Sequence, residues 1–494
     1  MSMISIPAPI GGWNARDSLD GMQPVDAVTM KNFIPRENAI ELRKGSLKQN
    51  TTVINDAINT MATYRQADGT EILIACGDSK VYKYDVSTDT LTQLASGFTN
   101  SKFQTVNFNN YILFVNGADA PKQYDGTTFG NYTSAVSGAT GTDLKGITVY
   151  KGRCYYWENN AAKFWYASAG AYGGALTAFQ LDLTAKKGGY VVECCSWTRD
   201  SGDGVDDLFV VLMSTGETLV YSGDDPGSNF SLIGRFNLGK PLSIRGSENL
   251  ASDRIIVTED GFVNLSYALQ SGRMTDAGNV SSKIISACKE QAKLYPDVFG
   301  WDIIFHPRES LLIINIPSGI QFAMNTNTGG WCEFKGLDIQ SWTIHDGKLY
   351  AGGSDGYIRE IFTGTSDDGN VIAGSVIPAF TALGNRSNQK QLTYVTVTTT
   401  IFQKKHIGLA GLADFDIISG GDASIPESAD VGEWDVSDWN DAYWGGEYNS
   451  VIKNHNMQAK ALGYAISCKL RIKTAVQTPK IYSFKYNFKT ARSI

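Results

Sequence analysis

The feature that most constrains the fold of this chain is a hairpin pattern that recurs through its middle. Each copy is an apolar strand, a turn containing Gly, Asp, Asn or Ser, and a second strand rich in Val, Tyr or Phe. Glycine accepts a positive φ and Asp or Asn bonds the nearby backbone, which favours chain reversal. Seven copies occupy residues 72–85, 112–125, 153–166, 208–222, 254–266, 311–324 and 348–361.

The spacing of these hairpins predicts a β-propeller. The copies begin about 35 to 60 residues apart. A four-stranded propeller blade needs about 40 to 50 residues, so each hairpin is expected to form half of one blade. The sequence therefore predicts an all-β fold whose residues 56–370 form a propeller of about six or seven blades. A set of unrelated hairpins in stacked sandwiches is the alternative, but no linker-like break interrupts the array.

Residues outside this array are expected to form other β structure. Segments 392–402, 462–473 and 480–488 alternate between apolar and polar residues like half-buried strands. We therefore expect residues 371–494 to form an additional C-terminal β-sandwich-like domain. Residues 1–55 are expected to be an extended N-terminal segment that contributes some strands.

One helix is predicted within the propeller region. Four residues fall on one face at near-helical spacing, and Pro296 follows them. Ser281 or Ser282 is expected to cap the start of this helix, which would act as a buttress between blades. The four residues of the face are Ile284, Cys288, Ala292 and Tyr295.

Two adjacent blocks of opposite charge mark the C-terminal region. Residues 414–447 hold ten acidic residues and no Lys or Arg, whereas residues 451–494 hold nine basic residues and no Asp or Glu. The two blocks are expected to pair across strands or across a subunit boundary. In the second case Lys469, Arg471 and Lys473 are candidate interface residues.

The sequence lacks the patterns that mark catalytic or metal centres. The four histidines do not stand at metal-ligand spacings, and HExxH, GxSxG and the glycine-rich phosphate loops do not occur. The seven cysteines are odd in number and form no CxxC pair, so reduced, buried thiols are expected. We therefore predict no enzymatic activity and no cofactor or metal.

Neither a secretory leader nor a membrane span is expected. Residues 1–13 have no basic start followed by an apolar run, and no apolar run approaches the ~20 residues that span a bilayer. The formal net charge of −7 does not favour adhesion to duplex nucleic acid, which needs a basic footprint.

An aromatic and acidic cluster is the most distinctive candidate interaction site. Trp434, Trp439, Tyr443 and Trp444 lie in a short segment that also holds Asp435, Asp438 and Asp441. Such rings can stack on sugars or fill a pocket of a partner. Alternatively, the short polar residues and the Gly-Gly pair that follows form tight turns whose rings pack onto their own domain.

A set of motifs in fixed order resembles a known family. The chain contains Gly-Gly-Trp-Asn at 11–14, Met-Gln-Pro at 22–24, Asn-Phe-Ile-Pro-Arg at 32–36 and Leu-Arg-Lys-Gly at 42–45. Tyr-Asp-Gly at 124–126, Met-Asn-Thr-Asn-Thr-Gly-Gly-Trp-Cys at 324–332, Tyr-Ala-Gly-Gly-Ser-Asp-Gly at 350–356 and the tryptophan-rich string at 434–446 follow. In this order, over about residues 8 to 450, they resemble the tail nozzle or tail hub proteins of short-tailed bacteriophages, also called tail tubular protein B or DNA-stabilisation proteins.

The resemblance implies a structural virion protein. It implies a homohexameric ring below the portal and adaptor, with a propeller as the body of each subunit. Genomic DNA would pass through the lumen non-specifically, and further β-domains would dock to the adaptor and to tail fibre, spike or needle proteins. The ring would assemble in the host cytoplasm and remain in the virion tail. An acidic lumen would repel phosphates.

Other classes of function stay open at this stage. A carbohydrate- or receptor-binding propeller would need exposed aromatic platforms, for which Trp434, Trp439, Tyr443 and Trp444 are candidates. A propeller glycoside hydrolase would need two buried carboxylates that face the central channel. A cellular scaffold of the WD-repeat type is disfavoured because Trp-Asp dipeptides do not end the hairpins.

Overall fold

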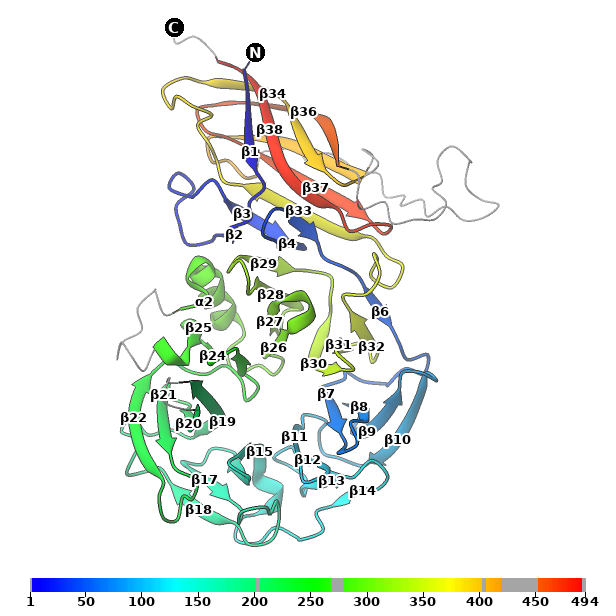
Figure 1. Ribbon diagram of the computed structural model, residues 1–494, viewed down its shortest axis with the longest axis vertical. Helices are drawn as coiled ribbons and strands as arrows, with labels where there is room; N and C mark the ends of the chain where they lie inside the picture. The colour runs from blue at the N-terminus through cyan, green and yellow to red at the C-terminus, as the bar shows by residue number, and fades with distance from the viewer. Residues whose placement is uncertain (1, 201–204, 268–278, 402–405, 419–451, 491–494) are drawn as a thin grey trace.

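Seven blades of antiparallel strands surround a common centre in the computed structural model, which describes residues 2–200, 205–267, 279–401, 406–418 and 452–490 (Figure 1). The seven hairpins of the sequence are the second and third strands of these seven sheets. The predicted β-propeller is therefore confirmed, and seven blades are formed by the described residues.

The first four blades follow one another along the chain, each a simple meander of four strands. Blade 1 is β7 (Thr60–Arg65), β8 (Glu71–Gly77), β9 (Lys80–Asp85) and β10 (Thr90–Ser96). Blade 2 is β11 (Gln104–Phe108), β12 (Tyr111–Val115), β13 (Lys122–Tyr124) and β14 (Phe129–Asn131). Blade 3 is β15 (Leu144–Tyr150), β16 (Arg153–Glu158), β17 (Lys163–Tyr166) and β18 (Thr177–Gln180). Blade 4 is β19 (Val191–Asp200), β20 (Val205–Met213), β21 (Glu217–Ser222) and β22 (Ser231–Asn237).

The last three blades depart from this simple pattern. Among the described residues, blade 5 has three strands, β23 (Ser247–Leu250), β24 (Asp253–Thr258) and β25 (Gly261–Asn264). Blade 6 is β26 (Asp302–His306), β27 (Leu311–Ile316), β28 (Ile320–Asn325) and β29 (Trp331–Phe334). Blade 7 is β30 (Ile339–His345), β31 (Lys348–Gly353), β32 (Ile358–Ile361) and β6 (Ser46–Lys48).

The ring closes through strand β6, which precedes blade 1 in the chain but forms the outer strand of blade 7. It pairs antiparallel with β32, where Leu47 lies opposite Glu360. The residues that start the ring therefore also complete its last blade. Such closure protects the edge of that blade and fixes the first blade beside it.

Helix α2 (Ile285–Leu294) follows blade 5, as the apolar spacing predicts. Ile284, Cys288 and Ala292 are buried against blades 5 and 6, so the helix is a buttress between them. Ser281 stands at the N-cap position of the 3-10 turn Ser282–Ile284 that leads directly into α2, as predicted, but its side chain makes no capping hydrogen bond. Its hydroxyl instead accepts a hydrogen bond from the backbone N–H of Phe262 at 2.9 Å. The described helices include none long and apolar enough to cross a bilayer.

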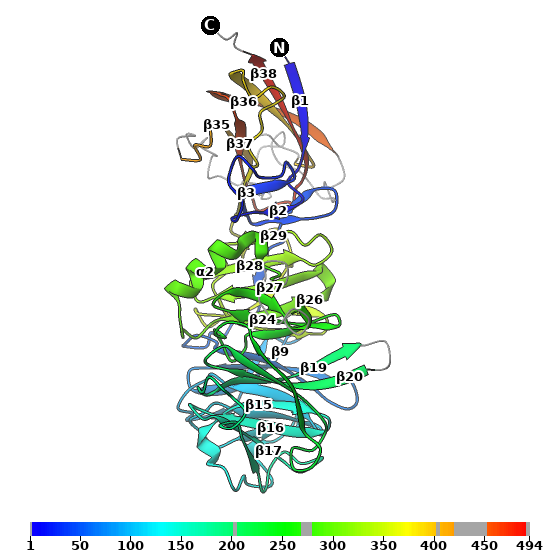
Figure 2. The ribbon, with the colours of Figure 1, turned by 90° about the vertical axis from the view of Figure 1, so that its left-hand side faces the viewer.

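A β-sandwich lies beyond blades 6 and 7, as Figures 1 and 2 show. One of its sheets has the order β36–β34–β38–β5–β4, with β1 also paired to β38. These strands are β36 (Lys453–Gly463), β34 (Lys390–Thr399), β38 (Lys480–Thr490), β5 (Ile40–Leu42), β4 (Phe33–Pro35) and β1 (Ser2–Pro7). Residues from both ends of the chain thus share this sheet.

The second sheet of the sandwich continues directly from blade 6. Its order is β26–β27–β28–β29–β2–β3–β33–β37–β35, nine strands in one path. The strands outside blade 6 are β2 (Gly12–Trp13), β3 (Asp26–Lys31), β33 (Ile372–Pro378), β37 (Ile466–Thr474) and β35 (Ile407–Ala413). Propeller and sandwich are therefore joined by backbone hydrogen bonds.

The hydrophobic core follows the same arrangement. Most of its clusters fill the space between two neighbouring blades, as Phe209 and Tyr155 do between blades 3 and 4. The largest cluster instead runs from Leu311 in blade 6 and Leu349 in blade 7 into the sandwich, where it contains Phe484. A continuous apolar core resists hinge motion, because opening it would expose apolar surface to water.

Candidate functional site: the interdomain joint and its groove

Four of the sequence motifs that carry the family resemblance meet at the junction of propeller and sandwich. They are the glycine-rich motif at 11–14, the motifs at 32–36 and 42–45, and the end of the motif at 324–332. The first three stand near the start of the chain and the fourth stands in blade 6, yet they meet in or beside the same nine-stranded sheet. We call this region the joint.

Gly12 brings two backbones together at the joint. It pairs in parallel with Trp331 of β29 and with Asp26 of β3. Its φ is +79°, and a Cβ at this position would lie 2.5 Å from the backbone nitrogen of Trp331. Only glycine fits such a close approach in this conformation. The motif therefore sets the distance between blade 6 and the sandwich.

Asn32 bonds three segments at once. Its side-chain Nδ2 donates to the carbonyl oxygens of Lys335 (3.1 Å) and Ala373 (2.9 Å). Its Oδ1 accepts from the backbone N–H of Lys335 at 2.9 Å and from Arg43 Nε at 3.1 Å. Asn32 is 4% exposed and has a φ of 57°. All four hydrogen-bonding sites of the amide are thus used in a buried place, where an unmade bond costs most.

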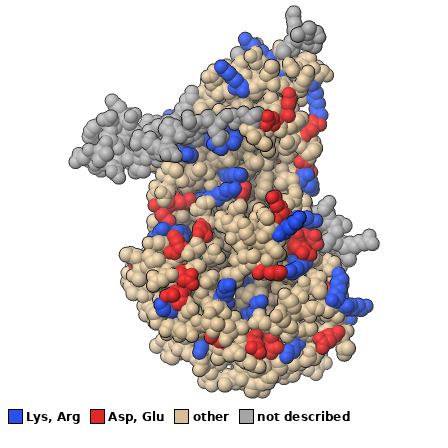
Figure 3. All heavy atoms as spheres, turned by 180° about the vertical axis from the view of Figure 1, so that it is seen from behind, with Lys and Arg blue, Asp and Glu red and all other residues tan. Residues whose placement is uncertain are grey.

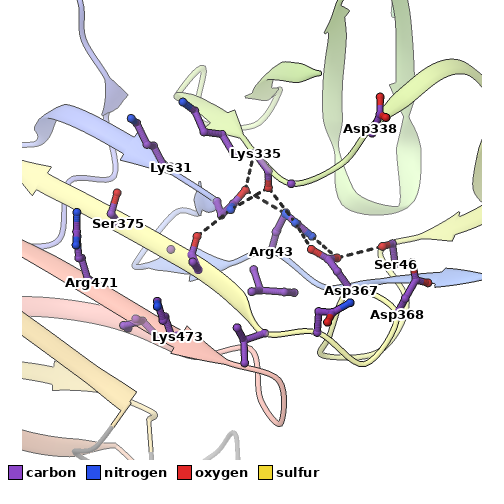
Figure 4. A pocket seen from close by; sticks show the side chains of 18 of the residues that line it. Lys31, Arg43, Ser46, Lys335, Asp338, Asp367, Asp368, Ser375, Arg471 and Lys473 are labelled. Carbon is purple, nitrogen blue, oxygen red and sulfur yellow. Dashed lines mark hydrogen bonds and ion pairs between the residues drawn. The ribbon is translucent and has the colours of Figure 1, made fainter. Parts of the chain in front are cut away.

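Arg43 is the central cation of the joint and is only 1% exposed. Its guanidinium donates to both carboxylate oxygens of Asp367, at 2.9 and 2.5 Å, in addition to Asn32. It also donates to the carbonyl oxygens of Lys44 and Lys335, at 3.1 and 3.2 Å. The five N–H groups of the guanidinium therefore all have acceptors. Its positive charge is balanced by a bidentate contact with the Asp367 carboxylate (Figure 4).

A second ion cluster ties the joint to blade 6. Arg36 contacts Glu41 at 2.9 Å and Glu309 at 2.5 Å, and Lys44 contacts Glu309 at 2.7 Å. Burial alone would raise the pKa of Glu309, but hydrogen bonds from Lys44 and Arg36 outweigh it and lower that pKa. Glu309 therefore stays charged and holds two basic residues of the motifs against the propeller.

A groove of about 750 Å³ opens beside the joint. Its walls come from the joint and from the outer face of the sandwich sheet, and Figure 4 shows the side chains. Its charged lining residues are Lys31, Arg43, Lys48, Lys335, Asp338, Arg359, Asp367, Asp368, Arg471 and Lys473. Basic residues thus outnumber acidic ones in this groove, although the chain as a whole is acidic. In Figure 3, Lys and Arg atoms gather where the sandwich meets the propeller.

The structure brings together some of the residues proposed from the sequence. Lys469, Arg471 and Lys473 alternate along β37, and Arg471 and Lys473 line the groove. The aromatic candidates Trp434, Trp439, Tyr443 and Trp444 lie outside the described residues, as does most of the acidic run at 414–447.

Sequence reasoning missed the partners that complete this basic surface. Lys31 ends β3 and Lys335 follows β29, and both strands stand far before β37 in the chain. Each lysine lies one position beyond a buried residue, Met30 and Phe334 respectively, which is a weak sign of an outward-facing side chain. The sequence holds no sign that β3 and β29 would lie near β37.

The centre of the propeller is bridged by Arg245, which precedes blade 5. Its Nη1 donates to the carbonyl oxygen of Asn59 at 2.9 Å. Its Nη2 donates to Thr60 Oγ1 at 2.7 Å and to the carbonyl oxygen of Phe103 at 2.6 Å. Asn59 and Phe103 lie just before blades 1 and 2, on the far side of the ring from blade 5. The arginine therefore links the start of blade 5 to the starts of blades 1 and 2 across the centre of the ring (Figure 1).

Carboxyl groups on the inner strands of blades 4, 5 and 6 have unusual pKa values. Burial raises the pKa of Glu193 to about 7, although Arg254 and Ser247 oppose the shift. Burial also raises the pKa of Glu248 to about 7 and that of Asp302 to about 6. The charge of Arg254 opposes the rise in the pKa of Glu248, and the charge of Arg245 opposes the rise in the pKa of Asp302. This arrangement keeps part of the carboxyl population neutral near pH 7.

These carboxyl groups make stability depend on pH. The pKa of Glu193 is higher in the folded chain than the ordinary 4.5, so folding favours the protonated form. The stabilisation by the proton is complete below about pH 4.5 and is lost as pH rises through about 7. The wild-type chain is expected to lose unfolding free energy between pH 5 and pH 8. Glu193→Gln should make this loss about 2 kcal/mol smaller. Urea unfolding of both proteins at pH 5 and at pH 8 measures these free energies.

Glu290→Gln provides the control for this experiment, because Glu290 is exposed on α2. It should keep the wild-type difference between pH 5 and pH 8. An equally large difference in Glu193→Gln and the wild type would show that Glu193 does not titrate in this range.

Comparisons with known proteins add little to this geometry. No family model and no curated protein matches the chain. The computationally designed Ika8 protein is similar at 9% identity with a TM-score of 0.40, over 65% of this chain and 99% of its own. The WD40 β-propeller domain of Doa1 is 13% identical (TM-score 0.39; 65% and 96% covered). YCF48 bound to D1 peptide is 11% identical (TM-score 0.41; 64% and 94% covered).

Proposed function

We propose that this chain is a structural subunit of the tail nozzle or hub of a short-tailed bacteriophage. Copies would form a homohexameric ring that conducts the genome out of the capsid and retains it until ejection. The ring would contact an adaptor on one side and tail fibre, spike or needle proteins on the other. It would assemble in the host cytoplasm and remain in the virion tail.

The observation that carries this proposal is the convergence of the family-like motifs on the joint. Residues of these motifs supply the tight glycine contact, the Asn32 hydrogen bonds and the Arg43–Asp367 pair. Their common role is to fix the propeller rigidly to the sandwich. Rigid union of two β-domains suits a part that must hold its shape beside packaged DNA, and it requires no catalytic residue.

Arg245 restricts the route of DNA in this proposal. Because its side chain crosses the centre of the propeller, the genome would not pass through the channel of a single subunit. The conduit would instead be the space enclosed by the ring of subunits. Residues that face this space are still expected to be net acidic.

The test is the mass and shape of the purified full-length chain. A hexamer has six times the mass of one 53.7 kDa chain. We expect mass photometry to show this species, alone or with its adaptor, and electron microscopy to show a ring with an open centre. A chain that stays monomeric in both conditions and is missing from purified virions would overturn the proposal. Loss of glycan binding in Trp439→Ala would instead support the receptor-binding alternative.

A further inference from the structure

A second cavity, of about 320 Å³, opens at the centre of the propeller. It lies at the end of the ring where the inner strands begin, because most of its lining residues stand just before or at the start of β11, β15, β19, β23 and β26. We call this cavity the channel mouth. Figure 3 views the propeller from behind, and Lys and Arg atoms lie near its centre in that view. The polar lining residues of the channel mouth are Asn100, Lys102, Asn116, Lys145, Tyr190, Lys240, Ser243 and Asp297.

Lys145 enters the channel mouth from a β-bulge. The register of β15 against β16 shifts between Leu144 and Gly146, so Lys145 is the extra residue. A bulge turns a side chain out of the regular alternation of its strand. Lys145 is half-buried, and within the described part of the chain its ammonium group forms no hydrogen bond or ion pair.

The ammonium group of Lys145 is partly removed from water without a counter-charge. Burial lowers its pKa, and no carboxylate of the described residues opposes that shift. A cation in such a place is stabilised by an anion that enters the cavity, because the fold itself does not offset the lost hydration.

Two of the three lysines in the channel mouth have no carboxylate partner among the described residues. Lys240 contacts Asp297 at 2.8 Å, and Asp297 is the one acidic side chain that lines the cavity in the described part of the chain. Lys102 instead lies over the ring of Phe299, with its Nζ 4.7 Å from the ring centre. Lys102 and Lys145 therefore bring two positive charges that no carboxylate of the cavity balances.

One wall of the channel mouth is apolar. Phe299 belongs to it, and its ring also lies 5.3 Å from the guanidinium of Arg245. The other apolar residues of this wall are Val192, Pro241, Leu242, Ile244 and Val298. A volume of about 320 Å³ is that of the smaller ligand pockets, in which apolar walls surround a few polar groups. The cavity therefore suits a small organic anion better than a bare ion.

We propose that the channel mouth binds a small phosphate monoester. Such a group carries nearly two negative charges at neutral pH, which match the charges of Lys102 and Lys145, and its three terminal oxygens accept hydrogen bonds from ammonium groups. A carboxylate or a DNA phosphodiester carries one charge and would leave one lysine unbalanced. The organic part of the ligand would contact the apolar wall. The inference does not depend on the proposed tail function, because one chain forms the whole cavity.

Calorimetric titration of the full-length chain with phenyl phosphate tests this inference. At pH 8 the ligand is a dianion, and we expect saturable binding of one ligand per chain. Phenylacetate and methyl phenyl phosphate, which are monoanions of similar size, should bind about tenfold more weakly or worse. Inorganic phosphate should also bind more weakly than phenyl phosphate, because it has no group for the apolar wall.

Three results of this titration would overturn the inference. They are the absence of saturable binding of phenyl phosphate, equal binding of phenylacetate, and equal binding of the monoanionic diester. A phosphoserine peptide that binds more tightly than phenyl phosphate would assign the cavity to a modified protein segment and would also overturn it.

Lys145→Met should weaken the binding of phenyl phosphate about tenfold or more, because it removes a charged donor. Lys145→Arg should retain binding. Without ligand, Lys145→Met should raise the midpoint of thermal unfolding, because a half-buried charge without a partner is lost. A lower midpoint would show that the chain itself stabilises the ammonium group, and it would overturn the inference.

Asp297→Asn should tighten binding about threefold or more, because it removes the repulsive carboxylate and releases Lys240. Asp297 has a φ of 56°, a conformation that Asn also adopts readily. Damage to the fold would not increase affinity, so a gain distinguishes charge from structure. Unchanged or weaker binding would show that the ligand does not meet the charges of this cavity.

Lys151→Met is the matched control. Lys151 is exposed just beyond the other end of β15, outside the lining of the channel mouth. It should leave binding within about twofold of the wild type. Circular dichroism of each variant shows that it is folded. Equal losses in Lys145→Met and Lys151→Met would place the ligand outside the channel mouth and overturn the inference.

Discussion

Gly12→Ala is expected to lower the free energy of unfolding by about 3 kcal/mol, because the new methyl group has no space and the backbone has an unfavourable φ. The φ of Gly12 is +79°, and a Cβ would lie 2.5 Å from the nitrogen and 2.7 Å from the oxygen of Trp331. Both atoms belong to the backbone of β29, so the collision cannot be relieved by a side-chain rotation. Equilibrium unfolding in urea measures the loss.

The same variant should also loosen the union of propeller and sandwich. A chain whose joint is intact is expected to unfold in one transition, since one core runs through both parts. Separation of β2 from β29 should split this into two transitions, seen when tryptophan fluorescence and circular dichroism no longer coincide.

Gly329→Ala is the control for backbone strain alone. Gly329 has a φ of +67°, but nothing lies within 4 Å of the position of its missing Cβ. We expect a loss of about 1 kcal/mol and a single transition. Equal losses in the two variants would show that the close contact at Gly12 contributes nothing of its own.

Asp367→Ala is expected to cost about 3 to 5 kcal/mol, because it leaves the buried Arg43 guanidinium without its counter-charge. Arg43 is 1% exposed, and Asp367 contacts it through both carboxylate oxygens. Chemical unfolding of the variant measures the cost. The double variant Arg43→Met with Asp367→Ala should recover part of the loss, because no charge is then buried alone.

Asp20→Ala provides the exposed counterpart of this experiment. Asp20 contacts Arg386 at 3.3 Å, and the side chains are 65% and 73% exposed. Solvent screens such a pair, so a change below about 1 kcal/mol is expected. A loss at Asp367 no greater than that at Asp20 would contradict the structural role assigned to Arg43.

The propeller could be predicted from the sequence because its signal is local. Each hairpin contains its own turn and both of its strands, and the seven hairpins proved to be the centres of seven blades. The helix at 285–294 was predictable for the same reason, since its spacing of apolar residues lies within one segment. The position of Ser281 at the start was predictable too, but its hydrogen bond was not, because the hydroxyl accepts from Phe262 in blade 5 and caps no helical N–H.

The joint could not be predicted, because its contacts connect distant parts of the chain. Arg43 and Asp367 are 324 residues apart, and Asn32 and Ala373 are 341 apart. Nothing in the composition of either segment indicates that it contacts the other. The closing strand β6 and the contribution of Lys31 to the groove were missed for the same reason, although the alternation of β37 revealed Lys469, Arg471 and Lys473.

The order of the strands has a consequence for synthesis on the ribosome. The sandwich strands β4 and β5 end at Leu42, and the sandwich resumes only with β33 at Ile372, so the whole propeller is inserted between them. At about 5 to 20 residues per second, the first strands would wait roughly 15 to 70 seconds for their partners. During that time β3 and β5 present unpaired edges, which later pair with β33 and β38. A nascent chain with such a delay depends on the propeller folding early, because only the completed ring brings residues 42 and 372 close enough for the sandwich to form.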